Sequence, residues 1–172
     1  MTSGATVRYP DLAGRTVVLA ADRARASIAV EVARALAAQH ARFACVIADR
    51  SALTAALAAA AALDVPALGV NADPALPSVW ERVTPHTEQH LGPIDAVVTI
   101  GTPRIRRPVA SALLPDMLAR GRGVLIEIGP RVARRSSDGP VRHRSICINA
   151  DSDPASVAAF AVRAASNTDG IN

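Results

Sequence analysis

The sequence contains no lysine, and all 19 basic residues among its 172 are arginine. This absence excludes any reaction that needs a lysine amine. Aromatic residues make up only 2% of the chain, with one Tyr and one Trp, so few side chains could stack on nucleic-acid bases. Because the formal net charge is also only +4, we expect no nucleic-acid partner.

Long apolar runs are missing as well. No stretch reaches the roughly 18 apolar residues of a membrane span, and the alanine-rich run Ala52–Leu63 is too short. Met1–Gly4 does not resemble the start of a secretion signal. Cys45 and Cys147 lie in apolar stretches and are expected to be buried free thiols. These features predict a cytoplasmic protein without a membrane partner, and the alanine-rich, arginine-only composition suggests a GC-rich bacterial genome.

The chain does have a regular alternation of apolar runs and amphipathic segments. Half of its residues are hydrophobic, which is ample for a single domain over residues 1–172 with an ordered core over 10–167. Six short apolar runs have the composition of buried strands, namely Thr16–Ala20, Phe43–Ala48, Pro66–Val70, Ala96–Ile100, Gly123–Ile128 and Ser145–Asn149.

Helices are predicted between and after these runs. Ser51 is placed to cap the second helix and Asp153 or Ser152 the last, and the polar segment Arg131–Arg144 is predicted to be a loop. The predicted helices are Ile28–Ala38, Ser51–Leu63, Ser78–Leu91, Pro108–Ala119 and Pro154–Ser166. This alternation predicts an α/β fold with a Rossmann-like, doubly wound, mainly parallel sheet of about six strands.

Five stretches, in the right order, resemble short-chain dehydrogenases/reductases (SDRs). They resemble the family's first, second and fourth strands, its passage into the fifth strand and its late helix. These stretches are Asp11–Leu19, Ala41–Arg50, Leu91–Val98, Leu114–Gly123, and Asp153–Phe160 with Ala164–Asn167. The chain is therefore similar to a degenerate, truncated member of the SDR superfamily, which implies an NAD(P)-binding fold without implying activity.

The residues that do the family's chemistry are replaced or absent. The three glycines that let the phosphate loop approach pyrophosphate correspond to Arg23, Ser27 and Ala29, and Asp49 matches the family's acidic residue. The catalytic Ser falls on Pro130, the catalytic Lys is missing, and the only Tyr precedes the first strand. The resemblance thus implies vestigial positions, no bound cofactor and no carbonyl reduction by the chain alone.

Two helical segments of the family are shortened or missing, one after Gly101 and one between the fifth and sixth strands. In the family these helices build the main dimer contact. We therefore expect an interface of another kind through the helix Pro108–Leu118, including Leu113 and Leu114. The expected partner is an active SDR homologue or a carrier-linked biosynthetic enzyme, or a second copy in a homo-oligomer.

Arginines cluster after the predicted strands, where they would share the carboxyl edge of a parallel sheet. Such a rim could bind an anionic small molecule, for example a phosphorylated metabolite or a phosphopantetheine group, or an acidic protein. The competing interpretation is a set of solvated loops. The rim comprises Arg23, Arg25, Arg104, Arg106, Arg107, Arg131, Arg134 and Arg135, with Arg50 after the second strand.

Other polar residues each have a functional and a structural interpretation. Asp49 would bind a ribose or cap the next helix. Glu127, inside an apolar strand, is a candidate catalytic acid or base with a raised pKa, or it pairs with a nearby Arg. His86 and His90 have the spacing of a zinc motif but no third ligand, so no metal is predicted. A triad is only hinted at by His143, Ser145 and Asp138.

Three functions remain open. The first is a pseudoenzyme that serves as the non-catalytic partner subunit of an active reductase or biosynthetic enzyme. The second is a small-molecule enzyme of non-redox type, such as a cyclase, isomerase or lyase, that uses the crevice at the carboxyl edge. The third is an atypical NAD(P)-dependent oxidoreductase, ranked last because the cofactor loop and the proton donor are both missing.

Overall fold

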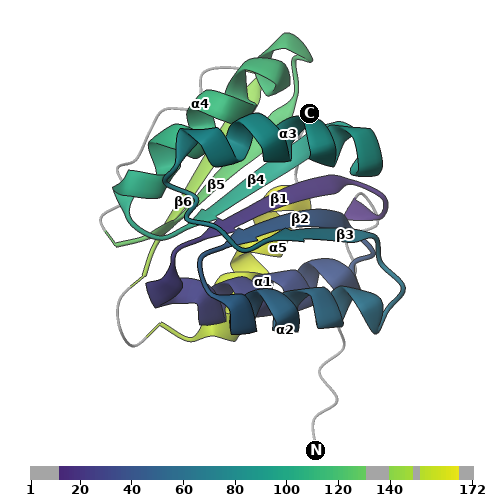
Figure 1. Ribbon diagram of the computed structural model, residues 1–172, viewed down its shortest axis with the longest axis vertical. Coiled ribbons are helices and arrows are strands. Elements are labelled where there is room, and N and C mark those ends of the chain that lie inside the picture. The colour runs from purple at the N-terminus through teal and green to yellow at the C-terminus, as the bar shows by residue number, and fades with distance from the viewer. Residues whose placement is uncertain (1–11, 131–139, 149–151, 167–172) are drawn as a thin grey trace, which may run out of the picture.

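The computed structural model describes residues 12–130, 140–148 and 152–166, which build one six-stranded sheet between two layers of helices (Figure 1). The strand order is β3-β2-β1-β4-β5-β6, and every neighbouring pair is parallel. The strands are β1 (Thr16–Ala21), β2 (Arg42–Ile47), β3 (Ala67–Val70), β4 (Ile94–Ile100), β5 (Gly123–Gly129) and β6 (Val141–Cys147). The predicted Rossmann-like α/β class is confirmed.

The helices fall into two layers. Helices α1, α2 and α5 cover one face of the sheet, and α3 and α4 cover the other (Figure 1). Their bounds, with those of the short 3₁₀ turn η2, are η2 (Arg23–Arg25), α1 (Ala26–Ala38), α2 (Arg50–Ala61), α3 (Pro77–Leu91), α4 (Pro103–Ala119) and α5 (Pro154–Ser166).

Burial on both faces explains why the strands are continuous apolar runs. Successive side chains of a strand point to opposite faces, and in β1 both sets are covered. Val17 and Leu19 pack under α1, while Val18 and Ala20 pack on the α3/α4 side, all with 0% exposure. Polar residues at either set would be desolvated, so the parallel strands read as unbroken hydrophobic stretches.

Several predicted boundaries shift by one or two residues, and two are wrong by four residues or more. Helix α4 begins at Pro103, five positions before the predicted start, and keeps Pro108 and Pro115 inside it. Ile105 is 2% exposed and Val109 is fully buried, so the apolar face of this turn outweighs the hydrogen bond that Pro108 cannot make. Strand β6 begins at Val141, inside the segment predicted as a loop, because β5 supplies a full parallel partner for its polar residues.

The two cysteines differ in environment. Cys45 is buried as predicted, and its burial raises the pKa of the thiol, which makes it a poor nucleophile. Cys147 is exposed at the end of β6, so the prediction that both thiols are buried is wrong. Within the described ranges, no helix combines the length and the apolar character that crossing a membrane requires.

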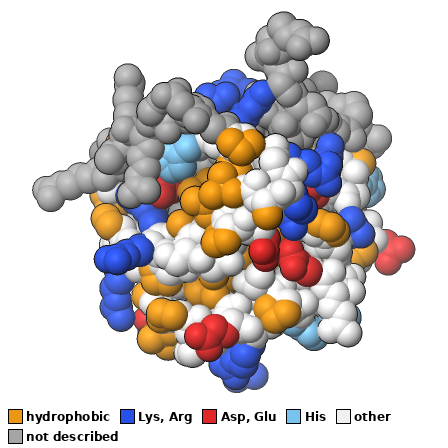
Figure 2. Space-filling model, turned by 90° about the horizontal axis from the view of Figure 1, so that it is seen from above, with side chains coloured by type: hydrophobic (Ala, Val, Ile, Leu, Met, Phe, Trp, Pro, Cys, Tyr) orange, Lys and Arg blue, Asp and Glu red, His pale blue; other side chains and the backbone are white. Residues whose placement is uncertain are grey.

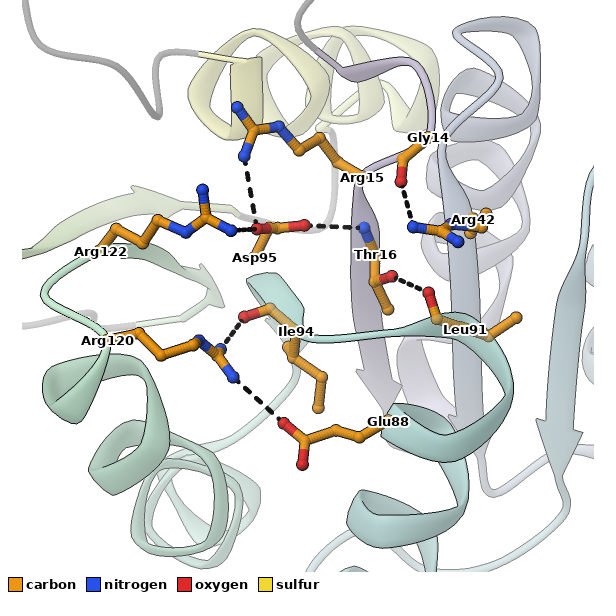
Figure 3. Close-up of polar contacts among 10 residues, drawn as sticks. All are labelled: Gly14, Arg15, Thr16, Arg42, Glu88, Leu91, Ile94, Asp95, Arg120 and Arg122. Atoms are coloured by element: carbon orange, nitrogen blue, oxygen red, sulfur yellow. Dashed lines mark hydrogen bonds and ion pairs between the residues drawn. The ribbon is translucent and has the colours of Figure 1, made fainter.

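The amino edge of the sheet is cross-linked by charged side chains (Figure 3). The buried carboxylate of Asp95 accepts from the Thr16 backbone N–H at 3.1 Å and lies 3.5 Å from both Arg15 and Arg122. Arg120 donates to the Ile94 carbonyl and pairs with Glu88 of α3 at 3.2 Å. These contacts hold the starts of β1 and β4 and the ends of α3 and α4 together.

Candidate functional site

The candidate site lies at the opposite, carboxyl edge. Open parallel sheets bind ligands outside the carboxyl ends of their strands, at the point where the strand order reverses. Here that point lies between β1 and β4, which run side by side up to the pair Ala21 and Ile100. The segments that leave these two strands, Asp22–Arg25 and Gly101–Thr102, therefore define the site.

Asp22 lies across the reversal point. One of its carboxylate oxygens accepts from the Arg25 N–H at 3.1 Å, and the other accepts from the Thr102 N–H at 3.2 Å. The Asp22 carboxylate lies so close to the backbone of residue 101 that only glycine fits there, since a Cβ on Gly101 would lie 2.4 Å from the carboxylate. A negative group of the chain itself thus uses backbone amides at the end of β1 and at the end of β4.

Arg23 connects the carboxyl ends of the neighbouring strands β1 and β2. Its Nε donates to the Ala48 carbonyl at 3.4 Å, which places the guanidinium beside Asp49. The Asp49 carboxylate caps α2, accepting from the Ser51 hydroxyl at 2.6 Å and from the Ala52 N–H at 2.9 Å. These hydrogen bonds, aided by the charge of Arg23, lower the pKa of Asp49. The cap interpretation of Asp49 is confirmed, and the prediction of Ser51 as the cap is wrong.

Arg106 connects the carboxyl ends of β4 and β5. Its guanidinium donates to the Gly101 carbonyl at 3.3 Å and to the Pro130 carbonyl at 3.5 Å. The residue is only 9% exposed, so it is not part of an exposed rim as predicted. The packing is tight, because a Cβ on Gly129 would lie 2.1 Å from the Gly101 oxygen and 2.7 Å from the Arg106 guanidinium.

The remaining rim arginines are dispersed. Arg25 pairs with Asp22 and Arg104 with Asp73, both at 3.5 Å. Arg107 is exposed on α4, and Arg50 is exposed as the first residue of α2. Of the vestigial loop positions, Ser27 and Ala29 lie within α1. Three predicted rim residues lie outside the described ranges: Arg131, Arg134 and Arg135.

Glu127 forms a buried pair that sequence reasoning did not foresee. It is 5% exposed, and its carboxylate lies 3.2 Å from Nε2 of His143 on β6. The two atoms are not aligned as a hydrogen bond, so the contact is an ion pair when His143 is protonated. Glu127 therefore pairs with an imidazole rather than with an Arg. A carboxylate next to an imidazole is a chemically competent proton-transfer pair.

The other predicted residues have structural positions. Leu113 is 2% exposed in the core under α4, so its predicted role in a subunit interface is wrong, while Leu114 is half-buried. The ring centroids of His86 and His90 lie 4.1 Å apart, with the ring planes tilted by 45°. No group of three potential metal ligands occurs among the described residues. Ser145 lies opposite Glu127 in the sheet register, and Asp138 lies outside the described ranges.

Comparison with known proteins identifies the fold. No protein-family model matches the sequence, and the search of curated proteins finds no significant match. Solved structures do match. A metagenomic short-chain oxidoreductase in complex with NADP shares 19% identity at a TM-score of 0.71, over 91% of this chain and 92% of that one. LigO from a Sphingobium species shares 15% identity at a TM-score of 0.74, over 92% and 81%.

An NAD+-bound xylitol dehydrogenase is also similar, with 15% identity and a TM-score of 0.60. This chain covers 54% of the length of that dehydrogenase, and 69% of this chain is matched. The class is thus defined by structure: the chain has the fold of the short-chain dehydrogenases/reductases. At these identities the similarity extends to the fold and not to the activity.

Proposed function

We propose that this chain is a pseudoenzyme with an SDR-like fold that serves as the partner subunit of another enzyme. The observation that carries the proposal is the occupation of the carboxyl edge by the chain's own charged groups. Asp22, Arg23 and Arg106 bridge three successive pairs of neighbouring strands. An enzyme of this fold would need that edge open for cofactor and substrate.

A nicotinamide dinucleotide does not fit these residues. Dinucleotide-binding folds place the pyrophosphate on free amides at the start of the helix after β1. Here the Arg25 amide already donates to Asp22, whose negative charge would repel phosphate. Asp49, the residue expected at the ribose, is bound to the first turn of α2.

The helix layer formed by α3 and α4 is the proposed partner surface. Figure 2 looks onto this side of the molecule and shows hydrophobic side chains at the surface among charges of both signs. Leu118 of α4 is 46% exposed and Leu76, just before α3, is 47% exposed, and half-buried Leu114 lies one turn before Leu118. The proposed partner is an active SDR homologue or a carrier-linked biosynthetic enzyme, with a homo-oligomer as the other outcome.

The test is co-expression with the products of neighbouring genes, followed by co-purification. We expect a complex that Leu114→Asp or Leu118→Asp dissociates, while Arg104→Ser with Arg107→Ser mainly slows association. Glu31→Gln, on the opposite helix layer, is the matched control and should leave the complex intact. A chain that sediments as a monomer at micromolar concentration and binds none of these products would contradict the proposal.

The second candidate, a non-redox enzyme, is favoured by one observation, the buried Glu127–His143 pair. Such an enzyme would use the pair for proton transfer on a small molecule, as a cyclase, isomerase or lyase does. Isotope exchange from D2O into a carbonyl compound, abolished by Glu127→Gln and by His143→Gln, would support it. The third candidate, an atypical oxidoreductase, requires saturable binding of NAD(H) or NADP(H), which calorimetry measures directly.

A further inference from the structure

A groove runs between α3 and α4, outside the strand ends that form the carboxyl-edge site. Its volume is 510 Å³, within the range of about 300–1,000 Å³ that is typical of small-ligand sites. Trp80 lines it at 1% exposure, so the indole forms the floor. The indole N–H donates to the Pro74 carbonyl at 2.9 Å, which fixes the orientation of the ring.

The two walls carry opposite charges that form no ion pair within the part of the chain that the structure describes. At the two ends of the helices, Arg104 pairs with Asp73 and Arg120 pairs with Glu88. Between these ion pairs, exposed Glu81 of α3 and exposed Arg107 of α4 both line the groove. Neither forms an ion pair with any residue in the described ranges. The helices are thus held together at their ends while the middle presents one anion and one cation.

The groove also has polar atoms that need donors. Pro85 and Pro115 have no amide hydrogen, so the carbonyls of Glu81 and Ser111, four residues earlier, lose their usual helical donors. The hydroxyl oxygen of Thr84 is buried and has no hydrogen-bond partner among the described residues. Glu81 and Ser111 are exposed, so water can reach their carbonyls in the free chain, whereas a buried hydroxyl such as that of Thr84 nearly always has a partner. All three atoms belong to residues that line the groove, and a ligand with N–H groups would offer donors to each.

We propose that this groove binds a short apolar peptide with free ends. Its ammonium group faces Glu81, its carboxylate faces Arg107, its amide hydrogens satisfy the acceptors, and an apolar side chain packs on Trp80. An extended tripeptide spans about 10 Å and carries its two charges at opposite ends, and the groove carries one charge of each sign on its two walls. The groove lies on the same α3/α4 layer as the proposed partner surface and shares Arg107 with it. A bound partner would therefore compete with the peptide, whereas peptide binding to the chain alone requires no partner.

Trp80 is the only tryptophan of the chain and lines the groove, so a ligand bound there is expected to change the fluorescence of a single indole. The probe is the tripeptide Leu-Ala-Leu with free ends, titrated into the full chain, and the comparison is the same peptide acetylated and amidated. We expect a saturable change in emission, with the capped peptide binding at least about tenfold more weakly because both charge-assisted contacts are lost. Equal binding of the two peptides, or no saturable change at millimolar concentration, would overturn the proposal.

Variants locate the site. Arg107→Ser and Glu81→Gln should each weaken binding about fivefold to tenfold, whereas Arg82→Ser and Asp116→Asn, which change neighbouring charges outside the groove, should not. Thr84→Val should have two opposite effects: it should raise the melting temperature of the free chain and lower its affinity for the peptide. An equal loss with the control variants would also contradict the site. None of these results depends on whether a protein partner is found.

Discussion

Charged side chains are paired differently at the two edges of the sheet. At the amino edge, Asp95 and Glu88 pair with arginine side chains from other elements, so charge meets charge across the layers (Figure 3). At the carboxyl edge, Asp22, Arg23 and Arg106 each bond to backbone groups at strand ends. The first arrangement stabilises the fold, whereas the second occupies the groups that this architecture otherwise offers to ligands.

The comparison predicts its largest effect at the amino edge. Asp95→Ala removes the acceptor of the Thr16 amide and leaves two guanidinium groups without their carboxylate. We expect the free energy of unfolding to fall by about 3 kcal/mol, measured by urea denaturation. Asp116→Ala, an exposed acid on α4, is the control and should cost little. A loss for Asp95→Ala below about 1 kcal/mol would remove the distinction between the edges.

A smaller effect on stability is expected at the carboxyl edge. Asp22→Ala frees the Arg25 and Thr102 amides, which water or an anion can then reach, so we expect a loss of about 1–2 kcal/mol. The same change should create weak, saturable binding of inorganic pyrophosphate that the unaltered chain lacks, measured by calorimetry. Stability loss without any gain in anion binding would mean that Asp22 is only a structural cap.

The smallest effect is the pH dependence of the α2 cap. The folded pKa of Asp49 lies below its unfolded value of about 3.9, so its charge stabilises the fold above that pH and ceases to do so as the pH falls through the lowered pKa. Asp49→Asn keeps a capping side chain but removes the charge. Its melting temperature should be slightly lower than that of the unaltered chain at pH 7, and the two should converge in acid. A constant difference across this range would exclude the charge as the cause.

The sheet and helix faces could be predicted because they depend on periodic burial. The β1 run Val17–Ala20 is apolar at every position, and α1 repeats buried residues at Ile28, Val32 and Leu36. The start of α4, near Pro108, was harder to predict. Local propensity argues against a helix through Pro108, and only the buried contacts of Ile105 and Val109, which are tertiary, decide for it.

The site could be predicted only as a location. The sequence indicates arginines after the strands, but not that Arg106 turns inward to two carbonyls, because that depends on the approach of Gly101 to Gly129. It indicates Glu127 as unusual but not its partner His143, because the parallel register of β5 and β6 brings them together. Gly101 and Gly129, at the ends of the neighbouring strands β4 and β5, were the sequence signal that the two backbones approach each other closely there.

The packing of α5 against α1 has a consequence for synthesis. Both helices belong to the same hydrophobic cluster, although α1 lies near the beginning of the chain and α5 is the last described element. A ribosome that has made β1 to β6 has therefore released α1 without its neighbour, leaving the apolar surface of α1 that packs against α5 uncovered. The nascent chain should need shielding until residue 166 emerges, and a stop codon before Pro154 should yield a chain that aggregates.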